Sequence, residues 1–246
     1  MSKTKLKKAP LKEVIFELHW ECAVNAPGIQ VDTGFDLAQG KFAERLKPEF
    51  PVHKKLIPDN VPFKLFGTPL HQYWKGELKW PVVQHGQGMI AVNEVEQGYE
   101  WENGYKPLVL KAVDHIISSY DEKLIFKRVK LQYIDAWDLD GSSPFEFIEK
   151  NLQTKITTSY QLPENLKNIN ILQTFDLEDK STMQLSITNG VNNQNQKQSV
   201  IWTTTVEKLG KFDHPSILEW LEMAHSLTSK MFKQMLNPDF YVSLDE

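Results

Sequence analysis

The chain of 246 residues is 41% hydrophobic and 24% charged, and its formal net charge is −4. This composition is typical of a globular protein with a large core, and it lacks the excess of basic residues expected of a protein that binds nucleic acid over its whole surface. No apolar run approaches the ~20 residues that span a bilayer, so we expect no membrane contact. The single cysteine, Cys22, and a basic N-terminus without the apolar core of a secretory signal favour the cytoplasm.

Residues 1–9 form a basic segment that we expect to be a flexible tail. Its positive charge comes from Lys3, Lys5, Lys7 and Lys8. Such an arm could contact the phosphates of a nucleic acid, whereas the simpler interpretation is a solvated segment without a partner. Nucleic-acid binding therefore rests on this tail alone.

Residues 10–125 are predicted to form a first α+β half. Alternating apolar residues predict a strand over Glu13–Trp20, and helical spacing predicts a helix from Phe35 to Leu46 that Pro48 ends. A second helix is predicted between Val109 and Tyr120. Between the helices we expect an irregular connection, with an edge strand at Phe63–Phe66 and a hairpin of Tyr73–Trp80 with Met89–Val95.

Residues 126–246 are predicted to repeat this order. A strand over residues 128–139 precedes a helix that starts at a capping box of Ser143 and Glu146 and buries Phe145, Ile148 and Leu152. Three antiparallel strands follow, with a polar and flexible loop before the last: Asn170–Leu177, Met183–Thr188 and Val200–Glu207. The strongest helical pattern is the last, Pro215–Leu236, with Ser216 and Glu219 as a capping box.

Both halves thus follow the order strand, helix, antiparallel strands and long helix, which we interpret as an internal duplication. The fold class is α+β, and we expect a curved antiparallel sheet with helices on one face. This arrangement is similar to TATA-binding-protein-like and helix-grip folds, a likeness of shape that implies no function.

The sheet face without helices would be polar, and it would be either plain solvent-exposed surface or a platform for a protein or ligand. The residues predicted to line it are not predominantly basic, which argues against DNA binding there. They are Glu17, His19, Lys75, Glu77, Lys79, Thr182, Gln184, Ser186, Thr188, Thr203 and Thr205.

The common enzyme signatures are absent: there is no nucleophile elbow, phosphate-binding loop, His-Glu-x-x-His motif or cysteine pair for zinc. We therefore predict no catalytic residue, metal or cofactor. His225 falls on the apolar stripe of the last helix, where it is either a neutral core histidine or an acid–base group at the mouth of a pocket. Asp135 interrupts the apolar face of its strand and needs a partner, for which Arg128 and His225 are candidates. Tyr133 and Trp220 would complete the pocket.

An aromatic cluster precedes the second helix of the first half. Tyr99, Trp101 and Tyr105 are interleaved with Glu100 and Glu102. Aromatic rings with neighbouring carboxylates could clamp a base or a cationic ligand. The other interpretation is that the rings fix the start of the helix to the core.

Several short segments occur in a recognisable order: Pro-Leu-Lys-Glu-Val-Ile-Phe from Pro10, Tyr-Glu-Trp-Glu from Tyr99, Arg-Val-Lys-Leu-Gln-Tyr-Ile-Asp from Arg128, and Trp220 with His225. Together they resemble a sporadically distributed family of uncharacterised prokaryotic proteins of similar length. Gln132 and Asp135 replace the arginine and asparagine usual in that family's midpoint pattern. The resemblance implies no activity, but the family's distribution is similar to that of genes in defence or toxin–antitoxin loci.

These observations favour a non-catalytic cytoplasmic binding or adaptor protein that acts with a protein encoded nearby, as a subunit of an anti-phage defence or toxin–antitoxin system. A homo-oligomer is compatible with the same observations. The alternative is an enzyme or a sensor of a small, nucleotide-like ligand, with a pocket between the sheet and the last helix. Candidates for contact with the ligand or partner are Tyr99, Trp101, Arg128, Tyr133, Asp135, Trp220 and His225.

Overall fold

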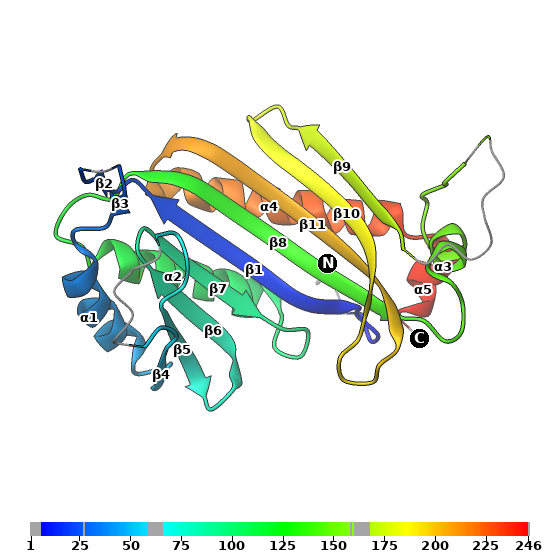
Figure 1. Cartoon of the computed structure of the whole chain (residues 1–246), viewed down its shortest axis with the longest axis horizontal. Coiled ribbons are helices and arrows are strands. Elements are labelled where there is room, and N and C mark those ends of the chain that lie inside the picture. The colour runs from blue at the N-terminus through cyan, green and yellow to red at the C-terminus, as the bar shows by residue number, and fades with distance from the viewer. Residues whose placement is uncertain (1–5, 27, 59–65, 158, 160–167, 246) are drawn as a thin grey trace. The chain divides into compact units, whose positions relative to one another are not determined.

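A computed structural model describes residues 6–26, 28–58, 66–157, 159 and 168–245 (Figure 1). It confirms the predicted class, because a nine-stranded antiparallel sheet has several helices packed on it. The strand order is β4 (Val52–Lys55), β5 (His71–Gly76), β6 (Lys79–Gly86), β7 (Met89–Glu94), β1 (Leu11–Trp20), β8 (Phe126–Asp138), β11 (Gln198–Phe212), β10 (Ser181–Val191) and β9 (Asn170–Asp176). A small second sheet pairs β2 (Ala23–Val24) with β3 (Gln30–Val31).

The chain divides into two compact units that are interleaved along the sequence. Unit 1 consists of Met1–Glu13, Gln132–Val206 and Glu222–Glu246, and unit 2 of Val14–Leu131 and Glu207–Leu221. Strands β1, β8 and β11 therefore have residues in both units, as does the long helix α4 (His214–Met235). The division into halves at residues 125 and 126, and the duplication behind it, stay predictions.

In unit 2, helices cover the apolar face of the strands. Phe42 of α1 (Phe35–Leu46) contacts the rings of Tyr73 and His85, which share a sheet face with Val92 and Phe16 through the strand register. Helix α2 (Lys106–Ile117) adds its own apolar stripe to this core, and its buried residues are Val109, Ala112, Val113 and Ile116. The structure confirms both predicted helices. Both were predictable because amphipathic spacing is a strong signal.

One predicted strand of unit 2 is wrong, because Tyr73–Trp80 is not a single segment. A turn at Glu77 and Leu78 separates β5 from β6, and Leu78 adopts a positive φ of 52° there. Lys75, Glu77 and Lys79 therefore lie around this turn and not along the polar face. Strand β6 then forms a second hairpin with β7 across Gly88, whose φ is 69°.

The predicted edge strand Phe63–Phe66 falls largely outside the described residues. Phe66 itself forms a single bridge with Gln87. Of the predicted basic tail, Lys3 and Lys5 also lie outside the described part, while Lys7 and Lys8 are exposed.

In unit 1, the predicted strands and the capping box are confirmed. The Ser143 Oγ accepts from the Glu146 amide at 3.2 Å, and the Glu146 carboxylate accepts from the Ser143 amide at 2.8 Å, so α3 (Pro144–Asn151) starts as expected. The buried aromatic of this helix is Phe147, whereas Phe145 is partly exposed. The core around it consists of Leu139, Ile148, Leu152, Ile187, Val200, Trp202, Leu236 and Leu244.

The last long helix has a different N-cap from the predicted one. Asp213 accepts hydrogen bonds from the amide of Ser216 at 3.1 Å and from its hydroxyl at 2.5 Å, so the helix begins at His214 and the box of Ser216 with Glu219 is wrong. A short helix, α5 (Pro238–Ser243), follows it. No helix among the described residues combines the length and the apolar character needed to cross a membrane.

Candidate functional site

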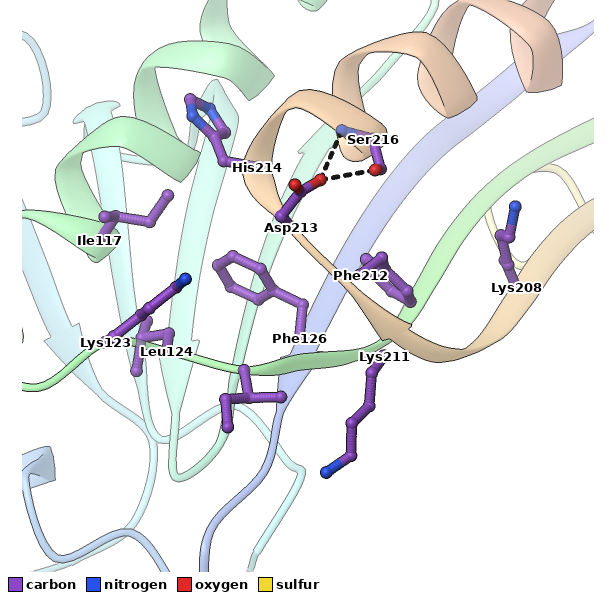
Figure 2. A pocket seen from close by; sticks show the side chains of 11 residues that line it. Ile117, Lys123, Leu124, Phe126, Lys208, Lys211, Phe212, Asp213, His214 and Ser216 are labelled. Atoms are coloured by element: carbon purple, nitrogen blue, oxygen red, sulfur yellow. Dashed lines mark hydrogen bonds between the residues drawn. The ribbon is translucent and has the colours of Figure 1, made fainter.

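The first candidate site is a pocket of about 590 Å³ in unit 2 (Figure 2). Its wall includes apolar side chains, with Phe126 buried, and the lysines Lys123, Lys208 and Lys211. Asp213 and His214, at the start of α4, also line it. Figure 2 shows Lys123 reaching toward Phe126, whereas Lys211 extends away from the helix and pairs with Glu21 at 3.0 Å.

This pocket is not the predicted one. Tyr133, Asp135, Trp220 and His225 are absent from its lining. Sequence reasoning missed the pocket because its lysines come from two distant segments, and charges scattered along a chain do not show that they share a wall. The volume lies in the range of small-molecule sites in proteins.

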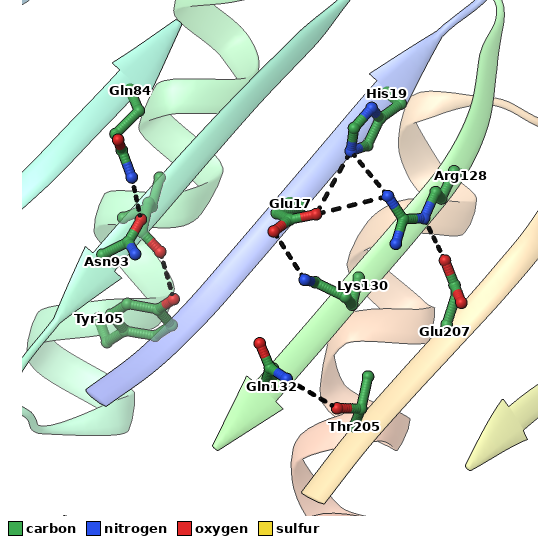
Figure 3. Close-up of polar contacts among 11 residues, drawn as sticks. Glu17, His19, Gln84, Asn93, Tyr105, Arg128, Lys130, Gln132, Thr205 and Glu207 are labelled. Carbon is green, nitrogen blue, oxygen red and sulfur yellow. Dashed lines mark hydrogen bonds and ion pairs between the residues drawn. The ribbon is translucent and has the colours of Figure 1, made fainter. Parts of the chain in front are cut away.

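The second candidate site is a charged cluster in unit 2 (Figure 3). It lies on the sheet face opposite the one that Phe42 of helix α1 packs against. It consists of Glu17 and His19 from β1, Arg128 and Lys130 from β8, and Glu207 from β11, and we refer to these residues as the charged cluster. Residues two apart on a strand share a face, and neighbouring strands bring those faces together. The sequence placed Glu17 and His19 on this face and named Arg128 as a candidate.

Glu17 and Arg128 hold the charged cluster together. Lys130 Nζ lies 2.6 Å from Glu17 Oε1, and Arg128 Nη1 lies 3.6 Å from Glu17 Oε2. Arg128 Nε also donates to Glu207. The structure therefore pairs Arg128 with Glu17 and Glu207, which corrects its suggested role as the partner of Asp135. Arg128, at an even-numbered position of β8, points to the face opposite that of the odd-numbered residues.

His19 has two alternative partners at one atom. Its Nε2 lies 3.2 Å from Arg128 Nη1 and 3.4 Å from Glu17 Oε2. The role of Nε2 depends on the tautomer: it accepts from Arg128 when the ring proton is on Nδ1, and it donates to Glu17 when the proton is on Nε2. The ring can therefore bond either neighbour without moving.

The charged cluster is half buried and electrically balanced. The exposed fractions of the side chains are 20% for Glu17, 14% for Lys130 and 33% for Arg128. Burial raises the pKa of Glu17, but hydrogen bonds from His19 and Lys130 outweigh that effect and bring the pKa to about 2. The carboxylates of Glu17 and Glu207 therefore face the cations Lys130 and Arg128, so the two signs balance in these ion pairs.

A row of amides continues the polar face across β5, β6 and β7. Gln72 Nε2 donates to Gln84 Oε1 at 3.1 Å. Gln84 Nε2 in turn donates to Asn93 Oδ1 at 2.9 Å (Figure 3). Gln84 lies opposite Ala91, and Ala91 lies opposite Glu17, so the row and the charged cluster share a face. This part of the surface is thus a fixed hydrogen-bonded array.

The structure brings together two of the predicted residues in unit 1. The hydroxyl of Tyr133 lies 2.9 Å from His225 Nδ1. Asp135 is 5% exposed, and no hydrogen bond to its carboxyl is seen in the part of the chain that the structure describes. Burial raises the pKa of Asp135 to about 7, although Lys12 lowers it. Asp135 is therefore a buried acid that is partly protonated at neutral pH.

The remaining candidates are packed. Trp220 is 4% exposed. Trp101 and Tyr105 are buried in a π-helical turn, η1 (Trp101–Tyr105), and Tyr105 donates to the Val92 carbonyl at 2.7 Å. The ring of Tyr99 lies 5.7 Å from that of Tyr105. These contacts favour the interpretation that the rings fix the start of α2, because a clamp needs accessible ring faces.

Sequence reasoning also missed Asp32, whose buried carboxylate joins four segments of unit 2. It accepts from Trp20 Nε1 at 3.2 Å, the Gly34 amide at 3.2 Å, the Gly88 amide at 3.0 Å and the Tyr120 hydroxyl at 2.6 Å. Burial, with a further contribution from Asp32, raises the pKa of the Cys22 thiol to about 12. The thiol therefore stays protonated and is a poor nucleophile at neutral pH.

Comparisons with models of known protein families and with curated proteins find no match. Within the described ranges, no group of three or more histidine, cysteine or acidic side chains is arranged to hold a metal ion.

Proposed function

We propose that this chain is a non-catalytic binding protein that presents the charged cluster and the amide row to a protein partner. The observation that carries the proposal is the half-buried, charge-balanced array of Glu17, His19, Arg128, Lys130 and Glu207 on the sheet face opposite helix α1. The partner that we propose is encoded nearby, within a defence or toxin–antitoxin system, and complex formation takes place in the cytoplasm.

Charge balance favours a protein over a nucleic acid as the partner. Contact with a phosphate backbone requires uncompensated lysine and arginine, whereas Arg128 and Lys130 each face a carboxylate. Complementary charges between proteins set the orientation and the rate of association. Arginine at the centre of such a surface is a frequent energetic hot spot.

Preorganisation also supports a binding role. Residues of the charged cluster are already held by ion pairs and are already partly desolvated, so docking would immobilise few additional side chains. The ordering of side chains is a substantial part of the free-energy cost of association. A surface that is fixed before binding reduces that cost.

The decisive experiment is native mass spectrometry of the protein co-expressed with the products of its neighbouring genes. We expect a stoichiometric complex. Arg128→Ala should weaken it by roughly 30-fold, the loss typical of a hot-spot arginine. Lys41→Ala is the matched control, because Lys41 lies on helix α1 and forms an exposed ion pair with Asp121. A complex that Arg128→Ala leaves unchanged, or a chain that stays alone beside every neighbour, would contradict the proposal.

A second candidate function is the sensing of a small anionic ligand with an apolar part. The observation that favours it is the pocket of about 590 Å³, in which lysines stand beside Phe126 and Phe212. Lys123 has no ion pair or hydrogen bond among the described residues, although Asp213 interacts with it electrostatically. An anion would bring Lys123 a partner, whereas Asp213 opposes anion binding.

The melting temperature measured with a nucleoside monophosphate tests this second function, and inorganic phosphate is the control for charge alone. We expect the nucleotide to raise the melting temperature and Lys123→Ala to abolish that increase. Lys41→Ala should leave it unchanged. An equal increase with phosphate would point to charge without recognition of the apolar part, and no increase with either compound would dispose of the sensor.

A further inference from the structure

Strand β9 is an edge of the nine-stranded sheet, and within the described residues it pairs with β10 alone. Six of its seven residues are exposed, and the other, Ile171, is partly buried. Leu172 is 62% exposed and Phe175 is 43% exposed. An open edge with apolar side chains is a template for pairing with another strand.

The strand at the other end of the sheet order carries the usual protection. Strand β4 has four residues, two of which are Lys54 and Lys55, and Pro51 precedes it. Short length, lysine and proline all discourage edge-to-edge pairing. Strand β9, with seven residues, contains neither lysine nor proline. This contrast indicates that another strand pairs with the β9 edge.

The hydrogen bonds at the start of the β9–β10 hairpin show which backbone groups are available. The Leu177 amide donates to the Ser181 carbonyl at 2.8 Å, and the ladder continues with Asp176 opposite Thr182. Hydrogen-bonded pairs alternate along an antiparallel ladder, so the odd-numbered residues of β9 point their backbone groups toward β10. The even-numbered residues Asn170, Leu172, Thr174 and Asp176 point theirs outward.

We propose that a second copy of this chain covers the edge, with the two β9 strands antiparallel and centred on Gln173. In this register every outward-pointing residue meets another, because Leu172 lies opposite Thr174 of the second copy and Asn170 lies opposite Asp176 of the second copy. All seven residues of the strand are paired. A twofold axis passes through the centre, as in most homodimers.

The side chains are complementary in this register. Ile171 meets Phe175 of the second copy, an aliphatic–aromatic pair of the kind that stabilises antiparallel strands. Asp176, the single charged residue of β9, meets an asparagine that can donate to it, so no like charges face each other. This self-complementarity favours a second copy over an unrelated strand, and the surface is independent of the charged cluster.

The first test is the mass of the full chain purified alone, by light scattering after size exclusion at micromolar concentration. We expect a dimer. Thr174→Pro removes an outward amide and should give a monomer with an unchanged far-ultraviolet spectrum. Leu209→Lys is the matched control, because Leu209 is 67% exposed but lies on β11, and this variant should remain dimeric. A wild-type monomer would overturn the proposal.

The second test fixes the register and does not depend on the folding of the proline variant. In a Cys22→Ser background, Gln173→Cys places two thiols opposite each other at a non-hydrogen-bonded pair, where the Cα atoms are ~4.5 Å apart and a disulfide can form. Leu172→Cys places its thiol opposite Thr174 instead. We expect oxidation to crosslink the Gln173→Cys chains at least tenfold more than the Leu172→Cys chains. Equal crosslinking, or a dimer without crosslinking, would exclude this interface.

Discussion

His85 is fully buried, and neither ring nitrogen has a hydrogen-bond partner among the described residues. The rings of Phe35 and Phe42 lie 4.8 Å and 5.1 Å from it. Burial, with a smaller contribution from His71, lowers the pKa of His85 to about 3. The ring is therefore neutral in the folded protein, and unfolding lets it take up a proton below its ordinary pKa of about 6.5.

This pKa predicts a loss of stability in acid. Between about pH 6.5 and 3 the unfolded chain binds the extra proton, so the free energy of unfolding falls by about 1.4 kcal/mol per pH unit as the pH falls. His85→Phe should remove this slope while keeping the aromatic packing, as measured by urea unfolding at pH 7, 6 and 5. His53→Phe is the comparison: burial lowers the pKa of His53 as well, but this residue is exposed, so its replacement should have a smaller effect. Parallel curves for wild type and His85→Phe would contradict the prediction.

Asp135 should show the opposite pH dependence. Its pKa is raised to about 7 in the folded protein, so the folded state holds the proton that the unfolded chain releases near pH 4. Stability from this group is present below about pH 4 and is lost as the pH rises to 7. Asp135→Asn should therefore raise the melting temperature at pH 8 and have little effect at pH 4.5. A variant that is less stable at pH 8 would show that Asp135 has a stabilising ionised partner.

At the scale of elements, the cap of α4 can be tested against the one predicted from the sequence. Asp213→Ala removes the acceptor for the Ser216 amide and should lower the urea midpoint. Glu219→Ala removes the residue that a box starting at Ser216 would require, and it should leave the midpoint unchanged. Comparison of the two midpoints decides between the caps, since the reverse result would restore the predicted box.

The sequence predicted the elements with strong local signals. Alternation in β1 and β8, the spacing of Phe35 and Phe42, and the Ser143 capping box all depend on residues close in the chain. The turn at Leu78 escaped because a leucine with positive φ has no sequence signature. Local pattern therefore decides where an element exists better than where it ends.

The charged cluster could be predicted only in part. Glu17 and His19 were placed on the polar face by parity, but the pairing of Arg128 with Glu207 joins residues 79 positions apart. That contact depends on β11 lying beside β8, which is a property of the strand order and not of either segment. The partner assigned to Arg128 from the sequence was wrong for the same reason.

At the scale of the whole molecule, strands β1, β8 and β11 and helix α4 have residues in both units. When one of these shared elements unfolds, both units lose part of their structure. We therefore expect a single cooperative unfolding transition. His85→Phe in unit 2 and Asp135→Asn in unit 1 should shift the same midpoint, with tryptophan fluorescence and circular dichroism coincident. Separate midpoints for the two probes would show that the units unfold independently.

The interleaving of the units also constrains how the chain folds as it leaves the ribosome. Unit 2 contains Glu207–Leu221, which is synthesised after most of unit 1, and unit 1 contains both ends of the chain. Proteins built from consecutive domains complete the N-terminal one first during translation. Here neither unit can be completed in that order, so the sheet stays incomplete until its last strand in the sequence, β11, has been synthesised.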